Sequence, residues 1–210
     1  MKKVFIECCL ESLNEAINAE KRGANQIELC RSLSDDGLTP DYKLARTVIN
    51  SVSVPVKIMV RPRKGNFIYS DEEMNQIKYQ ITTFKSIGVT QIVFGALNKH
   101  RTVDINHTKR VIEWSYPMQI TFHKAIDYSN NFFDDIESLI NLGGIDSILT
   151  SGKASTAQAG SGILKDVIKN YGEDIKIISA GKITDKNLNN IHRLINGKYY
   201  HGKNILGNLS

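Results

Sequence analysis

Several features are scarce in this chain of 210 residues, and each scarcity argues against a class of protein. Three cysteines, an odd number without regular spacing, argue against a disulfide framework and for free thiols in a reducing compartment. No run approaches the roughly 20 apolar residues of a membrane span, and the apolar segment before Glu7 is too short for a signal peptide. We therefore expect a cytoplasmic protein with no membrane partner.

Long runs of like charge are also missing. Lysine and arginine number 27 against 22 aspartate and glutamate, for a formal net charge of +5. No block of five or six like charges occurs, so the basic stripe of a nucleic-acid-binding protein is not expected. The mild positive excess favours small anions as ligands. Association of the chain with copies of itself is left open.

Eight short apolar runs alternate with amphipathic segments along the chain. Several are nearly continuous Val, Ile, Leu and Met, as is typical of strands buried on both faces of a parallel sheet. The predicted strands are Val4–Cys9, Gln26–Cys30, Val56–Arg61, Gln91–Ala96, Gln119–Lys124, Asp146–Ser151, Lys176–Ala180 and Tyr199–Gly202.

Helix-start signals precede the amphipathic segments. Ser12 with Glu15, and Ser70 with Glu73, have the spacing of capping boxes. Thr39 followed by proline is typical of an N-cap and first turn. Further helices are predicted near residues 105–115, 131–142, 162–170 and 185–195.

Eight strand–helix units without a linker predict an α/β protein with one domain, residues 1–210, folded as a (β/α)8 barrel of the TIM type. Only residues 204–210 follow the last strand, so we expect the final helix to be incomplete. The segments that follow strands are longer than those that follow helices. Functional sites of such barrels lie on the segments that follow strands, so the site is expected there.

A Glu-x-Cys motif closes each of the first two predicted strands. Glu7 shares a face with Cys9, and Glu28 shares a face with Cys30, because side chains alternate along a strand. Two carboxylates and two thiols are therefore expected to meet at neighbouring strand ends. The thiols are candidate ligands of Cu(I) or Zn(II), and the carboxylates are candidates for acid–base work.

Each motif also has a purely structural alternative. Buried cysteines often act as small hydrophobic side chains. A buried carboxylate needs a partner, and an ion pair with Lys57 or Arg61 within the barrel would provide one.

Other chemically active side chains follow later strands. Arg61 and Arg63 flank a proline, and guanidinium groups suit carboxylate or phosphate. His123 shares a face with Thr121, and its imidazole is a candidate acid–base group. The glycine-containing segments at 150–152 and 179–182 are either anion-binding loops or simply flexible. The candidate catalytic residues are Glu7, Glu28 and His123, and the candidate ligand-binding residues are Arg61, Arg63, Thr121, Ser151 and His201.

The motifs, taken in order, resemble the CutC copper homeostasis family, and the resemblance covers essentially the whole chain. It is carried by Glu7-x-Cys9, Gly23-Ala24-Asn25, Glu28-Leu29-Cys30, Gly37-Leu38-Thr39-Pro40, Arg61-Pro62-Arg63, Phe67-x-Tyr69-Ser70, Thr121-Phe122-His123, Leu149-Thr150-Ser151-Gly152 and His201-Gly202. The resemblance implies a cytoplasmic barrel with a role in copper homeostasis, in which Cys9 and Cys30 match the copper-binding cysteines.

Two hypotheses follow from the sequence. In the first, the chain is a copper homeostasis protein that binds Cu(I) through Cys9 and Cys30. In the second, it is a barrel enzyme that performs acid–base chemistry on a small phosphorylated or carboxylated metabolite. The second is kept because Glu, Arg and His side chains form a poor shell for Cu(I).

Overall fold

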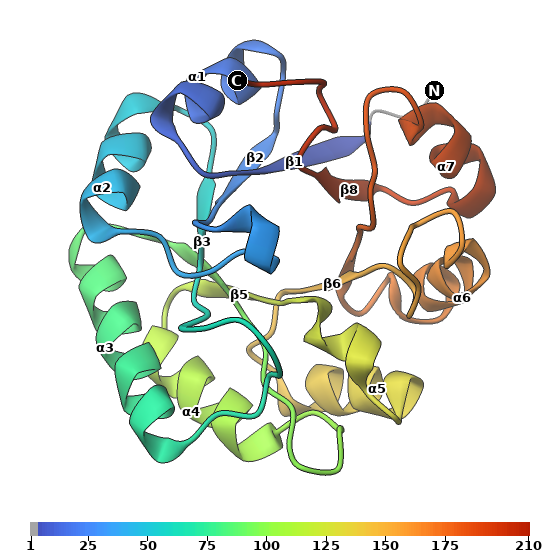
Figure 1. Ribbon diagram of the computed structural model, residues 1–210. Coiled ribbons are helices and arrows are strands. Elements are labelled where there is room, and N and C mark those ends of the chain that lie inside the picture. Colours follow the sequence, from blue (N-terminus) through green and yellow to red (C-terminus); the bar gives the residue numbers. More distant parts are fainter. Residues whose placement is uncertain (1–3) are drawn as a thin grey trace.

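The structure, a computed structural model that describes residues 4–210, is a closed barrel of eight parallel strands (Figure 1). Each strand pairs with its neighbours in sequence, and the last pairs with the first. The predicted (β/α)8 barrel is confirmed. The strands are β1 (Phe5–Leu10), β2 (Gln26–Leu29), β3 (Val56–Met59), β4 (Gln91–Phe94), β5 (Gln119–Phe122), β6 (Ser147–Thr150), β7 (Lys176–Ser179) and β8 (Tyr199–Gly202).

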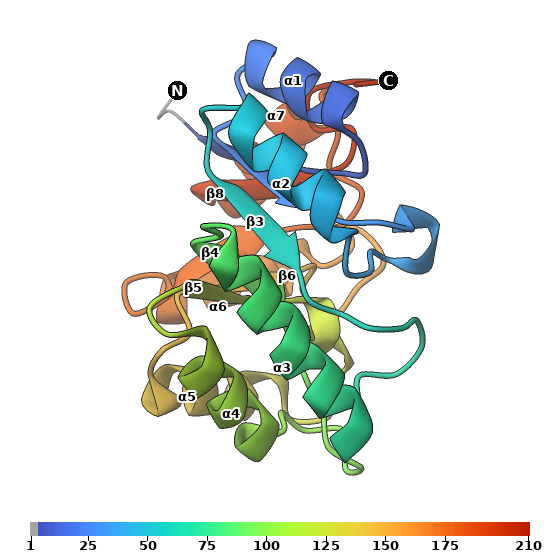
Figure 2. The ribbon, with the colours of Figure 1, turned by 90° about the vertical axis from the view of Figure 1, so that its left-hand side faces the viewer.

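Helices form a ring outside the strands, as Figures 1 and 2 show. Two short 3-10 helices, η1 (Leu33–Asp35) and η2 (Lys124–Tyr128), lie in segments that follow strands. None of the helices in residues 4–210 has the length and apolar character needed to cross a membrane. The α-helices are α1 (Leu13–Lys21), α2 (Tyr42–Ser51), α3 (Asp71–Ser86), α4 (Ile105–Ser115), α5 (Phe132–Leu142), α6 (Ser161–Tyr171) and α7 (Leu188–Ile195).

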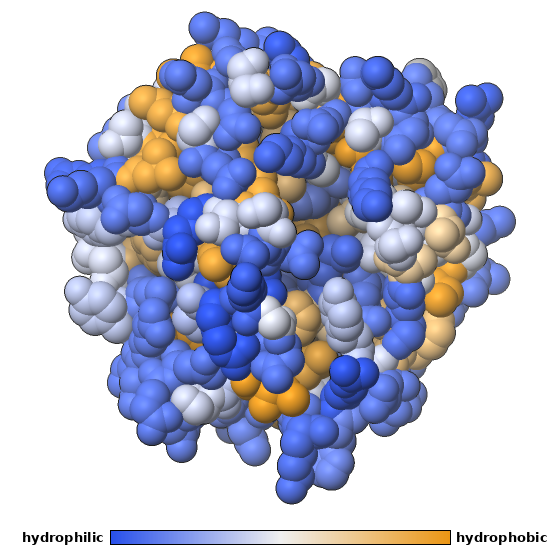
Figure 3. Space-filling view, viewed as in Figure 1, coloured by the Kyte–Doolittle hydropathy of each residue, from blue (hydrophilic) through white to orange (hydrophobic). Residues whose placement is uncertain are grey.

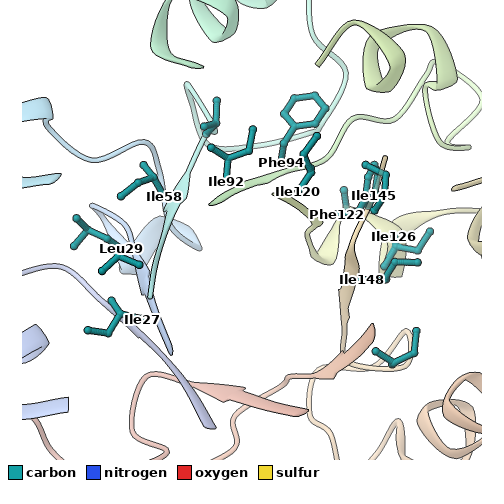
Figure 4. Packing of buried hydrophobic residues seen from close by; sticks show 14 of the residues in the cluster. Ile27, Leu29, Ile58, Ile92, Phe94, Ile120, Phe122, Ile126, Ile145 and Ile148 are labelled. Atoms are coloured by element: carbon teal, nitrogen blue, oxygen red, sulfur yellow. The ribbon is translucent and has the colours of Figure 1, made fainter. Parts of the chain in front are cut away.

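The hydrophobic core lies between the strands and the helices. Figure 4 shows side chains such as Ile27, Ile58 and Phe122 on the outer side of the barrel wall. Burying a side chain of this kind stabilises the fold by about 1.5–3 kcal/mol. The alternate positions of the same strands face the barrel interior, and many of them are polar yet buried. These include Glu7, Gln26, Glu28, Lys57, Thr121, Ser147 and His201.

The helix starts agree only partly with the capping motifs predicted from the sequence. The capping box of α3 is present, since Ser70 Oγ accepts from Glu73 N at 3.3 Å and Glu73 Oε2 accepts from Ser70 N at 2.8 Å. At α1, Ser12 Oγ accepts from Glu15 N at 3.3 Å. The Glu15 carboxylate, however, accepts from the backbone N–H of Glu11 at 3.0 Å, so this motif is not a full capping box.

The prediction that Thr39 caps the next helix is wrong. Helix α2 begins at Tyr42, and Asp41 caps it by accepting from Lys43 N at 2.8 Å. Thr39 Oγ1 instead accepts from the backbone N–H of Arg61 at 2.9 Å. A tertiary contact that joins the segment before α2 to the end of β3 thus replaces the local cap.

The chain after β8 packs against α1 instead of forming a helix, so the expected incomplete final unit is confirmed for the described residues. Asn18 Nδ2 donates to the carbonyl of Leu209 at 2.9 Å, and Arg22 Nη1 donates to that of Asn208 at 2.6 Å. Ile205 and Leu209 are buried. Figure 1 shows the C-terminus beside α1, where this tail covers the barrel wall.

Candidate functional site

A cavity of about 390 Å³ opens where the strands end, and we call it the mouth cavity. Figure 2 shows the segments after β2 and β3 projecting on this side of the barrel. Figure 3 shows the same face, which is mostly hydrophilic, with hydrophobic residues visible mainly between polar ones. The predicted residues that line the cavity are Cys9, Glu28, Arg61, His123 and His201.

Cys9, Glu28 and His201 form a compact cluster on the cavity wall. The sulfur, one carboxylate oxygen and one imidazole nitrogen all lie within 4.8 Å of one another, and the three residues are buried. They come from neighbouring strands, because β1 pairs with β2 on one side and with β8 on the other. A thiol, a carboxylate and an imidazole at this spacing are a candidate metal-binding set.

Glu7 lies nearer the amino end of the barrel than His201 and fixes the orientation of its imidazole. The Oε1 atom of Glu7 lies 2.9 Å from His201 Nδ1, which leaves Nε2 on the side of Glu28, 3.9 Å from Glu28 Oε1. Burial opposes the charged form of His201, but the neighbouring Cys9 and the two carboxylates raise its pKa well above the usual value. The imidazole is therefore held by the Glu7 carboxylate on one side and faces Glu28 on the other.

Glu7 itself does not line the mouth cavity. It lines a second cavity of about 330 Å³ at the opposite, amino end of the barrel, together with Lys57 and Thr121. Its Oε2 atom lies 2.8 Å from Lys57 Nζ, so the predicted alternative of an internal ion pair with Lys57 is present. Burial would raise the pKa of Glu7, but Lys57 and His201 lower it to about 2. Glu7 is thus a permanent carboxylate at neutral pH.

The strand register explains why the two Glu-x-Cys motifs do not meet level with each other. Cys9 pairs with Glu28, and Glu7 pairs with Gln26, so the first motif is displaced toward the amino end by two residues. The thiol of one motif therefore lies beside the carboxylate of the other. Glu7 is left one layer deeper in the barrel.

Cys30 supports Glu28 and does not line the mouth cavity. Its sulfur lies 3.5 Å from Glu28 Oε1, and its side chain is buried with Met59 and Val93. Burial, with Glu28 next to it, raises the pKa of Cys30 well above its usual value, so the group remains a thiol. Burial, aided by Glu7, also raises the pKa of Glu28.

Arg61 ties together the two segments that project over the cavity. Its Nη1 donates to the carbonyls of Asp35 at 2.8 Å and Gly37 at 3.1 Å, and its Nη2 donates to Gly65 at 3.3 Å. The guanidinium also lies over the Phe67 ring, 5.0 Å from its centroid. The Nε atom is buried and has no hydrogen-bond partner in the part of the chain that the structure describes. The Nη1 and Nη2 atoms of the guanidinium therefore hold the two segments together, whereas Nε is left to donate to a ligand.

His123 is a neutral imidazole in the mouth cavity. Its Nδ1 accepts from Ala125 N at 3.2 Å, which places the ring hydrogen on Nε2. This atom is buried and has no hydrogen-bond partner within the described residues. Burial, and to a lesser extent Arg61, lowers the pKa of His123 to about 3. Gly95, which directly follows β4, makes room for the ring, since a Cβ there would lie 2.5 Å from Nδ1. The site thus contains an imidazole N–H that is free to donate.

Three predicted ligand-binding residues lie outside the mouth cavity. Arg63 donates to Glu73 and to the carbonyl oxygens of the loop that precedes α3. Thr121 is hydrogen-bonded to Ser147 at 2.8 Å, and Ser151 donates to Asp127 at 2.8 Å. Their side chains hold loops and strands in place.

Sequence reasoning missed several residues that line or shape the site. Lys203 lines the mouth cavity, and its signal was its position directly after the last predicted strand. Gly95, directly after β4, had a signal too, since a glycine at the end of a predicted strand leaves space for a neighbouring side chain. Lys182, which also lines the cavity, belongs to a segment that the sequence singled out as a candidate anion-binding loop.

A parallel eight-stranded barrel whose reactive side chains gather where the strands end is a TIM-type barrel with its site in the usual place. The CutC family model matches residues 4–206, and the chain belongs to the CutC family. The human copper homeostasis protein cutC homolog is 38% identical over 187 residues, which is 89% of this chain and 68% of that protein. The Dictyostelium discoideum homolog is 34% identical over 226 residues, covering 94% of this chain and 81% of that protein.

Solved structures show the same fold. The crystal structure of a CutC protein from Streptococcus agalactiae has a TM-score of 0.91 at 24% identity, covering 96% of this chain and 99% of that chain. Phosphoribosyl anthranilate isomerase from Thermococcus kodakaraensis has a TM-score of 0.59 at 18% identity, covering 94% and 87%. These likenesses concern the barrel alone.

Proposed function

We propose that this protein acts in copper homeostasis by binding one copper ion in the mouth cavity, with Cys9 and His201 as ligands and Glu28 as a third donor. The observation that carries the proposal is the cluster itself: three ligand atoms within 4.8 Å of one another, on buried side chains. Relatives that match most of this chain are named as copper homeostasis proteins, which supports copper as the ion.

The hydrogen bond between Glu7 and His201 supports the same assignment. Metal-binding histidines usually donate their second ring N–H to a carboxylate or carbonyl, which fixes the ring and its tautomer. Here Nδ1 contacts Glu7, whereas Nε2 lies 3.9 Å from Glu28 Oε1. The Lys57 ammonium in turn holds Glu7, so the ligand is supported by two successive contacts.

The donor set fits Cu(I) through its sulfur and nitrogen atoms. A thiolate and an imidazole suit Cu(I) and Zn(II), whereas a carboxylate is a harder donor. In this arrangement Cys30 is a supporting residue, because its thiol contacts Glu28 and lies outside the mouth cavity. This assigns different roles to the two cysteines that the sequence treated as a pair.

An anaerobic Cu(I) titration against a chromogenic chelator tests the proposal. We expect one ion per chain, with the affinity reduced in Cys9→Ser and His201→Gln by at least the roughly 10–100-fold typical of losing a supporting partner. Cys8→Ser is the matched control, since Cys8 is buried in the hydrophobic core on the opposite face of the same strand. Equal affinities for Cys9→Ser and Cys8→Ser would refute the copper site. A parallel Zn(II) titration shows whether copper is preferred.

We place this activity in the cytoplasm, because the three cysteines are free and buried, as suits a reducing compartment. Fractionation of the source cells tests the placement, and recovery of the protein with an oxidising extracytoplasmic fraction would contradict it.

A further inference from the structure

We propose that the mouth cavity also binds a small organic anion, a metabolite with a carboxylate or phosphate group, through the free N–H groups of His123 and Arg61. This ligand is separate from the copper ion, and its binding does not depend on the copper proposal.

The first observation is a pair of buried donors without partners. His123 Nε2 and Arg61 Nε are both buried, and neither has a hydrogen-bond partner among residues 4–210. The two residues line the same cavity, and their side chains are 4% and 3% exposed. Leaving a buried donor unsatisfied costs roughly 1–3 kcal/mol. A ligand oxygen in the cavity that accepts from both N–H groups would remove this cost for each of them.

The donor character of His123 is set by the backbone. Since Nδ1 accepts the N–H of Ala125, the ring presents a hydrogen on Nε2 and no lone pair there. Gly95 and the Phe67 ring, whose centroid lies 5.0 Å from that of His123, restrict the imidazole. The donor is therefore held in one orientation before any ligand enters.

The second observation is the charge of the cavity wall. Arg61, Lys124, Lys182 and Lys203 line it, against the carboxylates Glu28 and Asp36. Lys203 lies 3.6 Å from Glu11, whereas Lys124 and Lys182 form no salt bridge within residues 4–210. Excess positive charge in a cleft concentrates anions there.

The third observation is the size and mixed character of the cavity. A volume of about 390 Å³ falls within the roughly 300–1,000 Å³ range of small-molecule sites. Met59, Phe67 and Leu149 give it an apolar wall. These features suit an organic anion better than a bare inorganic ion.

Calorimetric titration in the presence of a metal chelator tests this inference without copper. The probes are glycerol 3-phosphate, citrate, inorganic phosphate and uncharged glycerol. The first two distinguish phosphate from carboxylate recognition, and we expect at least one of them to bind more tightly than about 1 mM, a modest affinity. Binding should shift the His123 Nε2–H resonance in the NMR spectrum of the unmodified protein. Failure of both organic anions to bind, or binding without that shift, would overturn the proposal.

Two variants and a control localise the binding. His123→Asn keeps an oxygen that accepts from Ala125 N–H but removes the Nε2 donor, and Lys182→Gln removes a cation at the rim. Each should weaken anion binding about tenfold, the equivalent of one charge-assisted hydrogen bond. Lys186→Gln alters an exposed lysine that does not line the cavity and should leave binding unchanged. If Lys186→Gln and Lys182→Gln lose the same amount of anion affinity, the loss reflects the net charge of the protein, and the site is refuted. This comparison holds even if His123→Asn fails to fold.

The outcome is independent of the copper site. Cys9→Ser should retain anion binding, whereas His123→Asn should retain Cu(I) binding, so failure of one proposal leaves the other standing. The enzyme hypothesis stays a prediction, and binding of such an anion is its first requirement.

Discussion

His201 Nδ1 lies 2.9 Å from Glu7 Oε1, and this contact connects the two ends of the barrel interior. On one side, Glu7 reaches Lys57 at 2.8 Å in the cavity at the amino end. On the other, His201 faces Cys9 and Glu28 in the mouth cavity. The position of a candidate metal ligand therefore depends on two residues that do not contact that cavity.

The Glu7–Lys57 pair should couple strongly in stability measurements. Glu7→Gln keeps an acceptor for His201 but leaves the Lys57 ammonium buried without a counter-charge, which costs about 3–5 kcal/mol. Lys57→Met should cost a similar amount by leaving Glu7 without its ammonium partner. The double variant should lose less than the sum, with a coupling energy of at least about 1 kcal/mol by urea unfolding. Strict additivity of the two losses would mean that the pair does not interact in solution.

Glu7 should also control copper affinity without touching the ion. In Glu7→Gln, the charge that orients His201 is lost, and we expect Cu(I) to bind about 10–100-fold more weakly, as is usual for a supporting residue. Gln26→Met is a suitable control, because Gln26 is a buried neighbour in the same layer whose side-chain amide donates to Gln91. The chelator competition assay measures the Cu(I) affinity of both variants. Equal affinities for Glu7→Gln and Gln26→Met would show that Glu7 does not support the copper site.

The neutral state of His123 predicts a loss of stability on acidification. The pKa is about 3 in the folded protein against the usual 6.5, so between these values the unfolded chain binds the extra proton. The free energy of unfolding should therefore fall as pH falls, by up to about 1.4 kcal/mol per pH unit from this residue. His201, with a raised pKa, acts in the opposite direction, since its contribution is present at low pH and lost as pH rises through its folded pKa.

Comparison with His123→Asn isolates the effect of His123. The difference in unfolding free energy between the original protein and the variant should shrink by about 1.4 kcal/mol per unit between about pH 6 and pH 4. A constant difference over that range would show that His123 titrates normally in the folded state.

Gly95 should be intolerant of even a methyl group. The Cβ of Gly95→Ala would lie 2.5 Å from His123 Nδ1, so the imidazole must shift, and overpacking of this kind costs about 1–3 kcal/mol. Gly162→Ala is the matched control, because nothing lies within 4 Å of its Cβ and it belongs to α6. Alanine there should stabilise the protein by up to about 1 kcal/mol. Thermal unfolding that ranks the two variants in the reverse order would contradict the packing described for His123.

The strands were predictable because both of their faces are covered. Runs such as 56–60 and 91–94 are apolar on the side that packs against helices, and this signal is local. The start of α2 was missed because Thr39 uses its hydroxyl for a tertiary bond to Arg61, and no local pattern reveals that choice. The sequence thus fixes each element more firmly than it fixes the contacts between elements.

The sequence predicted which side chains point into the barrel, but not how far along the barrel axis each one lies. Alternation predicted inward positions for Glu7, Cys9, Glu28 and Cys30; of these, Cys9 and Glu28 line the mouth cavity, and Glu7 lines the cavity at the amino end. Which of them lie level with each other depends on the register, and the pairing of Cys9 with Glu28 is set by how the whole barrel closes. The same holds for Arg61, whose carbonyl partners lie in segments remote in sequence.

The most direct test of the proposed copper site is the position of copper in crystals of the Cu(I)-loaded protein, measured by anomalous diffraction at the copper edge. We predict one strong peak in the mouth cavity, within bonding distance of Cys9 Sγ and His201 Nε2, with Glu7 still bonded to Nδ1. The peak should be absent in Cys9→Ser crystals prepared in the same way. A peak at Cys30 without Cys9, or copper only at surface histidines such as His100, would contradict it.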